Sequence, residues 1–216
     1  MNLSRFIPVI FSVLMVCLFS AGTARSDHVS FATTMLDHSS DPINQKFKKL
    51  IDENRIDQLR AYVASGVDVN TRDPKGVSPI HYAAFLGNVG AMRILISRGA
   101  DPQAVAFGGW SSLHYSAFGG HVEVSNLLVA MGVPIDIEDI GGETPLFYAI
   151  ESGHMKAVKW LVEHGANVNH VNHGGETPLA MAHQHENKAI AAYLQDRGKL
   201  TDIRPKDAPG QVEHKH

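Results

Sequence analysis

Histidine is the residue type in this chain that most directly suggests chemistry, because 13 of the 216 residues are histidine. The imidazole ring titrates near neutral pH and is a common metal ligand. A tight metal site needs three or four converging ligands, and residues two positions apart on a helix diverge by about 200°. We therefore expect no cofactor, and we keep weak zinc or copper binding as an alternative for four histidines near the C-terminus: His183, His185, His214 and His216.

Few residues are arranged for catalysis or for nucleic-acid binding. Residues 108–112 (GGWSS) place serines after glycines, but they lack the spacing and the preceding strand of a nucleophile elbow. The sequence has no phosphate-binding glycine loop with a lysine and no paired-carboxylate motif. The formal net charge is −3 at pH 7, and the absence of a Lys/Arg cluster excludes a strongly basic nucleic-acid binder. We predict that the protein is not an enzyme and binds no nucleic acid.

Residues 1–24 have the pattern of a secretory signal peptide. Arg5 precedes an apolar run over residues 6–19, and small residues follow up to Ala24, where cleavage is expected. We therefore predict a periplasmic or secreted protein with no membrane segment after cleavage. An uncleaved anchor is one alternative, but the apolar run is short for a spanning helix. Lipidation of Cys17 is another, but Val16 is not the small residue that such a signal has there.

Glycine returns at a fixed interval through most of the remaining sequence, and the step from Gly66 to Gly99 defines this repeat interval. Self-similarity at one period indicates a supersecondary unit that is built several times and stacked. Four units, numbered one to four below, align without gaps over residues 73–105, 106–138, 139–171 and 172–203. Two glycine series define them: Gly66, Gly99, Gly132, Gly165 and Gly198, and Gly76, Gly109, Gly142 and Gly175.

Each unit carries the signals of a turn followed by two helices. The turn glycine permits positive φ, and the serine or threonine two residues later can cap a helix. A further glycine ends this short helix, except in unit four, where Glu186 replaces it. Apolar residues at helical spacing follow, and the glycine of the first series fits the left-handed position that ends the second helix. In unit four we expect residues 195–197 to end the second helix before Gly198.

The repeated motifs resemble ankyrin repeats. They read SPIHYAA, SSLHYSA, TPLFYAI and TPLAMAH in the short helices and GNVGAMRILISRGAD and GHMKAVKWLVEHGANVN in the long ones, over about residues 42–203. The family implies an all-α repeat solenoid of stacked helix-turn-helix units with β-hairpin fingers. It implies a degenerate capping unit at residues 41–72 and a C-terminal capping unit at 172–203. Residues 25–40 are then expected to be a flexible leader, and 204–216 a disordered tail.

The resemblance also implies structural roles for several polar side chains. Histidines at five positions are expected to hydrogen-bond between helices instead of binding a ligand: His81, His114, His121, His154 and His164. Tyrosines that recur at the repeat interval are expected to pack with an exposed hydroxyl edge: Tyr82, Tyr115 and Tyr148.

In ankyrin arrays the finger tips and the exposed ends of the short helices form a concave face that binds other proteins. Here the corresponding positions are aromatic or apolar in the first half and acidic in the second. The predicted protein-binding residues are Phe85, Leu86, Phe107, Trp110, Phe118, Ile140, Glu143, Glu151 and Glu176. The expected partner is a protein, with a basic segment as one option, and the chain is expected to be a monomer. Packing within the array is the alternative role for Phe85, Trp110 and Phe118.

Two other functions stay open from the sequence. One is a periplasmic metal-binding or stress-protection protein that uses the histidines near the C-terminus. The other is a secreted bacterial effector that acts on host proteins, because the resembling family recurs in bacterial pathogens.

Overall fold

The computed structural model describes residues 41–201, which form pairs of packed helices and the loops that join them. The predicted signal peptide and leader fall on residues 1–40 and the predicted tail on residues 204–216, and all three lie outside the described residues. The elements in chain order are α3 (Pro42–Asp52), α4 (Ile56–Ala64), α5 (Pro79–Phe85), α6 (Val89–Ser97), the 3₁₀ turn η2 (Phe107–Gly109), α7 (Ser112–Phe118), α8 (Val122–Ala130), α9 (Pro145–Glu151), α10 (Met155–Glu163), α11 (Pro178–Gln184) and α12 (Lys188–Thr201).

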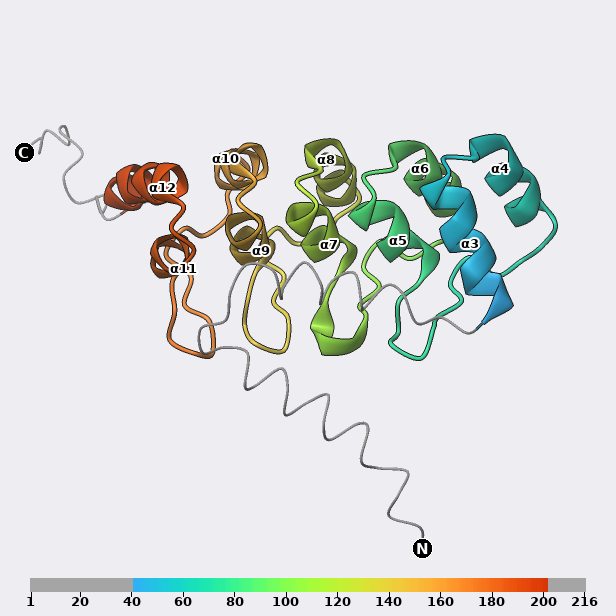
Figure 1. Cartoon of the computed structure of the whole chain (residues 1–216), viewed down its shortest axis with the longest axis horizontal. Coiled ribbons are helices and arrows are strands. Elements are labelled where there is room, and N and C mark those ends of the chain that lie inside the picture. The colour runs from blue at the N-terminus through green and yellow to red at the C-terminus, as the bar shows by residue number, and fades with distance from the viewer. Residues whose placement is uncertain (1–40, 202–216) are drawn as a thin grey trace, which may run out of the picture. The chain divides into compact units, whose positions relative to one another are not determined.

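The helix pairs stack side by side in two layers (Figure 1). One layer holds the short helices α5, α7, α9 and α11, and the other holds the longer helices α6, α8, α10 and α12. Helices α3 and α4 pack before the first of these units, against α5 and α6. Loops project from the short-helix layer between successive units, and these are the fingers. The architecture is an all-α repeat solenoid, as the sequence predicts.

The hydrophobic core runs along the array as rows of residues that recur once in each unit. Two rows are buried from unit one to unit four: Leu95, Leu128, Leu161 and Leu194 in the long helices, and Ala83, Ser116, Ala149 and Ala182 in the short helices. The small residues of the second row allow close approach between helices. Burying each leucine side chain contributes about 1.5–3 kcal/mol to the stability of the fold. Because one unit cannot bury its apolar face alone, each unit is stabilised mainly by the units next to it.

The short helices begin at the serine or threonine that the sequence predicts. Ser78 and Ser111 each form a capping box with the histidine three residues later. Thr177 accepts a backbone hydrogen bond at 3.2 Å. Thr144 also precedes its helix, but its buried hydroxyl finds no hydrogen-bond partner among residues 41–201. Phe147 stands in unit three where units one and two have the histidine.

The predicted fingers are hairpin loops that bond to one another. Each is closed by a backbone hydrogen bond between its first and fifth residues, with lengths between 2.8 and 3.1 Å. Within residues 41–201 the fingers contain no β-strand, and one isolated antiparallel bridge pairs Val105 with Ser111. Backbone bonds between consecutive units join neighbouring fingers: Phe107 N–H to Lys75 O, Ile140 N–H to Gly108 O and His173 N–H to Gly141 O.

The prediction for the end of unit four was wrong. In the preceding units the second helix ends beside a left-handed glycine, such as Gly165 with φ 99°. Helix α12 instead continues to Thr201, through residues 195–197 and Gly198. No further unit follows within the described residues, so nothing requires the chain to turn there. Glycine inside a helix costs only about 1 kcal/mol relative to alanine.

Candidate protein-binding surface

A ladder of aromatic rings crosses the short-helix layer from unit one to unit three. The Phe85 and Phe118 rings stack with their centroids 6.3 Å apart, and the Phe118 ring lies 6.2 Å from that of Trp110. The Trp110 ring contacts Tyr115 at 5.2 Å and Tyr148 at 4.3 Å. Each such pair contributes about 0.5–1.5 kcal/mol beyond the area it buries. These rings therefore hold neighbouring units together as well as forming surface.

The exposed apolar part of this surface lies at the finger tips and at the end of α5. Phe107 is 40% exposed, Ile140 59% and Leu86 36%. Phe107 and Ile140 occupy the same position in neighbouring fingers, which a backbone hydrogen bond joins. Trp110 and Phe85 are half-buried beside them in their units. The structure thus leaves a large apolar side chain exposed to solvent at the same position of two adjacent fingers.

Phe118 does not contribute to the exposed surface. Its side chain is only 8% exposed, because the rings of Phe85 and Trp110 both pack against it. The structure gives Phe118 the packing role, and the predicted protein-binding set has to be corrected at this position.

The tyrosine rings are buried, and the exposed hydroxyl edge expected for them was wrong. Tyr148 donates its hydroxyl proton to Asp139 Oδ2 at 2.5 Å, and Tyr82 donates to Asp73 Oδ2 at 3.3 Å. The Oδ1 atom of each aspartate accepts two backbone N–H groups of its own finger, as in an Asx-turn. Our sequence reasoning missed both aspartates, although each is the first residue of its unit.

Acidic side chains gather around Tyr148 at the third finger. Glu143 is half-buried, and its pKa is raised to about 7, first by burial and then by the negative charges of Asp139 and Glu151. The nearby hydroxyl of Tyr148 and the side-chain amide of Asn172 lower this pKa in part. The charges that act on Glu143 are thus both negative, so a positive group at this place would be stabilised.

Asn172 connects the third and fourth fingers. Its Nδ2 donates to Glu143 Oε1 at 3.2 Å and to Glu176 Oε2 at 3.5 Å, and its Oδ1 accepts the Glu176 amide at 2.8 Å. The residue stands where units one and three have their first aspartate. It brings two of the predicted acidic residues together, while Glu151, the third, is half-buried at the end of α9.

His81 and His114 are buried parts of the fold, as the resemblance implies. Each Nδ1 accepts the backbone N–H of the capping serine at 3.0 Å, so the proton is on Nε2. The Nε2–H groups donate to Ala104 O at 2.9 Å and to Glu143 O at 3.1 Å. Burial lowers the pKa of both histidines from 6.5 to about 4. Both are therefore neutral at pH 7.

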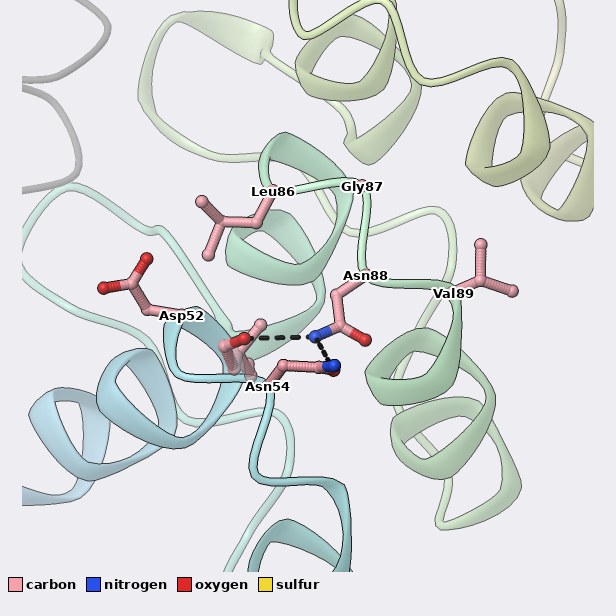
Figure 2. Close-up of a pocket in the computed structure, with 7 residues that line it drawn as sticks. Asp52, Asn54, Leu86, Gly87, Asn88 and Val89 are labelled. Carbon is pink, nitrogen blue, oxygen red and sulfur yellow. Dashed lines mark hydrogen bonds between the residues drawn. The ribbon is translucent and has the colours of Figure 1, made fainter.

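Side-chain hydrogen bonds also join neighbouring units at the turns between their helices. Figure 2 shows the first of these joints, where Asn88 Nδ2 donates to Ile51 O and to Asn54 Oδ1, both at 3.0 Å. Asp52 and Leu86 line the same pocket of about 360 Å³. The amides in this pocket bond to one another and to backbone, so the pocket is a joint between units.

The same position in units two and four makes the equivalent bond to the unit before it. The bonds are His121 Nε2–H to Phe85 O at 2.9 Å in unit two and Asn187 Nδ2–H to Ile150 O at 2.8 Å in unit four. The structural role expected for His121 is confirmed, and His154 occupies the same position in unit three with an exposed side chain. Sequence reasoning missed Asn88 and Asn187, although their spacing from the histidines by one repeat interval was the available signal. His164 differs, because it is exposed and bonds Trp160 O of its own helix at 2.7 Å.

The remaining histidines form no metal centre in the part of the chain that is described. No group of three or more potential metal ligands occurs within residues 41–201. His183 is exposed and shares a pocket with Glu186 and Lys188, and His185 is the C-cap of α11. His214 and His216 lie outside the described residues. The metal-binding alternative stays a prediction.

Comparison with known families gives the class of this protein. A family model for ankyrin repeats, in three copies, matches residues 48–139 and 126–207, which together are more than half of the chain. The chain belongs to the ankyrin-repeat family. Comparison with curated proteins gave no match. Ankyrin repeats generally mediate protein–protein interaction and are typically non-catalytic. None of the helices within residues 41–201 has the length and apolar character needed to span a membrane.

Proposed function

We propose that this protein is a non-catalytic scaffold that holds a protein partner on the face formed by its fingers and short helices. The observation that carries the proposal is the pair Phe107 and Ile140, 40% and 59% exposed on adjacent fingers. Large apolar side chains that stay exposed to water often mark sites where another protein binds. When such side chains are buried at an interface, a few of them contribute most of the binding free energy. The half-buried Trp110 beside them adds the residue type most enriched at such anchors.

The proposal is tested by measuring affinity for a partner isolated by cross-linking from the envelope fraction or culture medium. Replacing both Phe107 and Ile140 with alanine should weaken binding by at least about 2 kcal/mol, or roughly 30-fold. Met131→Ala is the matched control, because Met131 is 44% exposed but follows α8 in the long-helix layer. Unchanged affinity in the double variant, with helical content intact, would refute the placement of the binding face.

We also propose that the protein acts outside the cytoplasm, after cleavage behind Ala24. The support is the sequence itself, in which Arg5, the apolar residues 6–19 and the small residues up to Ala24 follow one another. Mass spectrometry of the protein purified from cells should find Arg25 as the first residue. Leu14→Arg should block processing, because a charge interrupts the apolar run. A wild-type protein that still begins at Met1 would contradict this proposal.

A further inference from the structure

The point where the aromatic and acidic parts of the face meet has a defined geometry. Tyr148 lies at this point, with its ring 4.3 Å from the Trp110 ring and its hydroxyl 2.5 Å from Asp139 Oδ2. The same hydroxyl lies near enough to Glu143 to affect the pKa of that carboxyl, and Asn172 contacts Glu143 from the fourth finger. An indole ring, a tyrosine and two carboxylates therefore lie close together on the face.

The charged groups that act at this place are negative. Asp139, Glu143 and Glu176 belong to the third and fourth fingers; Tyr148 hydrogen-bonds Asp139, and Asn172 hydrogen-bonds Glu143 and Glu176. Both charged groups that act on Glu143, Asp139 and Glu151, are negative. The histidine that packs here, His114, is held neutral by burial, which lowers its pKa to about 4.

The exposed apolar pair lies on the same two adjacent fingers as Trp110 and two of these carboxylates. Ile140 is in the same finger as Asp139 and Glu143, and Phe107 is in the same finger as Trp110. A ligand that fits this surface must bring an apolar group for the finger tips and a cation for the carboxylates. An arginine side chain meets the second need best, because its planar guanidinium stacks on an indole and bonds carboxylates with two N–H groups at once.

We infer that the partner inserts an arginine beside Trp110, where its guanidinium pairs with Glu143, while a neighbouring apolar side chain covers Phe107 and Ile140. This inference rests on the proposed function and names the chemistry of its partner. The chain supplies the complementary charge, the aromatic ring and the exposed apolar surface within two adjacent fingers.

The inference implies that binding is linked to a proton. With a pKa of about 7, Glu143 is partly protonated near neutral pH, and a cation beside it favours the ionised form. If binding lowers that pKa by about one unit, affinity falls roughly fivefold between pH 8 and pH 6. The other groups that face Glu143 are Asp139, Glu151, the hydroxyl of Tyr148 and the amide of Asn172. The neighbouring fingers also bring Glu176 through Asn172, and His170 through its bond to Gly142 O.

The direct probe is N-acetyl-arginine amide, titrated into the full chain and followed by NMR at the indole N–H of Trp110. The neutral isostere N-acetyl-citrulline amide is the control ligand. We expect a saturable shift with arginine only, with a dissociation constant on the order of 10 mM, as for a single exposed ion pair with a cation–π contact. The shift should be lost in Glu143→Gln, retained in Glu123→Gln, and roughly fivefold weaker in affinity at pH 6 than at pH 8.

Equal shifts with citrulline, or unchanged binding in Glu143→Gln with the fold intact, would overturn the inference. The second measurement uses the isolated partner. If the Phe107 and Ile140 double variant abolishes partner binding while Glu143→Gln leaves it unchanged, the proposed function stands and the arginine site fails. If neither the Phe107 and Ile140 double variant nor Glu143→Gln changes partner affinity, both the proposed binding face and the arginine site are wrong. Glu123→Gln removes the same charge at an exposed position in the first turn of α8 and reports any general electrostatic effect.

Discussion

The first two units and the last two units share one backbone structure but differ in the side chains that they expose, which are aromatic in the first pair and acidic in the second. In the first pair His81 and His114 cap their helices from inside the core, and the outer positions are aromatic. In unit three Phe147 takes the histidine position, and Glu143 and Asp139 surround Tyr148. The backbone pattern depends on glycines, capping residues and buried leucines, which all units share. The side chains on the finger face are free to differ, and this is how one repeat produces an asymmetric surface.

The largest expected effect of this difference is in the pH dependence of stability. The pKa of His81 and His114 is about 4 in the folded state and 6.5 in the unfolded chain. The unfolded chain therefore binds more protons between these values, and lowering the pH from 6.5 to 4 should cost up to about 3 kcal/mol per histidine. Glu143 acts in the opposite direction, because its folded pKa of about 7 lies above the unfolded value of 4.5. Its contribution grows as the pH falls from 7 to 4.5.

Urea unfolding at pH 7.5, 5.5 and 4 measures the sum of these opposing contributions. Because two histidines destabilise the fold at low pH and one glutamate stabilises it, the free energy of unfolding should decrease towards pH 4. Glu143→Gln should make that loss steeper, and His114→Phe should make it shallower. If the free energy of unfolding stays constant or increases as the pH is lowered from 6.5 to 4, the two halves do not differ in this way.

The second effect compares an interior finger with the last one. Gly109 and Gly175 occupy the same position and have nearly the same φ, 83° and 81°. Alanine costs about 1–2 kcal/mol at either for its left-handed backbone. At Gly109 an added Cβ would also lie 3.0 Å from the backbone of Asp139 and Ile140, whereas a Cβ added at Gly175 would meet no atom of the described residues within 4 Å beyond its chain neighbours.

We therefore expect Gly109→Ala to lower the free energy of unfolding by about 2–4 kcal/mol and Gly175→Ala by about 1–2 kcal/mol. Urea unfolding followed by circular dichroism measures both. Equal losses would mean that the fingers do not pack on one another as the structure shows.

Much of this fold could be predicted from the sequence because its signals are local. Turn glycines, capping hydroxyls and apolar spacing each act over a short stretch of chain, and their recurrence at one repeat interval confirms them mutually. The end of α12 was missed because a glycine stops a helix only where the next unit makes the chain turn. Gly198 has no such unit among the described residues, and it stays helical.

The proposed binding face could be predicted only in outline, because its chemistry depends on side-chain contacts both within and between units. The sequence places Phe118 and Trp110 at surface positions, but their rings cover one another. It likewise places Glu143 on the face, but not the hydrogen bond by which Asn172 of the next unit holds it. These contacts depend on how side chains are oriented in the folded array, so the repeated motifs do not report them.

The smallest expected effect concerns the turn inside unit four. Units one and two have glycine at this turn, with φ 67° at Gly87 and 75° at Gly120, whereas Glu186 is forced to φ 54°. Glu186→Gly should relieve that strain and stabilise the protein by about 1 kcal/mol, which raises the Tm by roughly 2–4 °C. Glu186→Ala keeps the strain and is the control, with little change expected. Equal Tm values for the two variants would argue against the strained turn.

Radical footprinting of the two tryptophans tests the central claim most directly, because one lies on each side of the array. Trp110 belongs to the finger face and Trp160 to helix α10 in the long-helix layer, and both are half-buried. If the finger face binds the partner, complex formation should protect Trp110 from oxidation and leave Trp160 unchanged. Protection of Trp160 alone, or equal reactivity of Trp110 in the free and bound protein, would contradict the account.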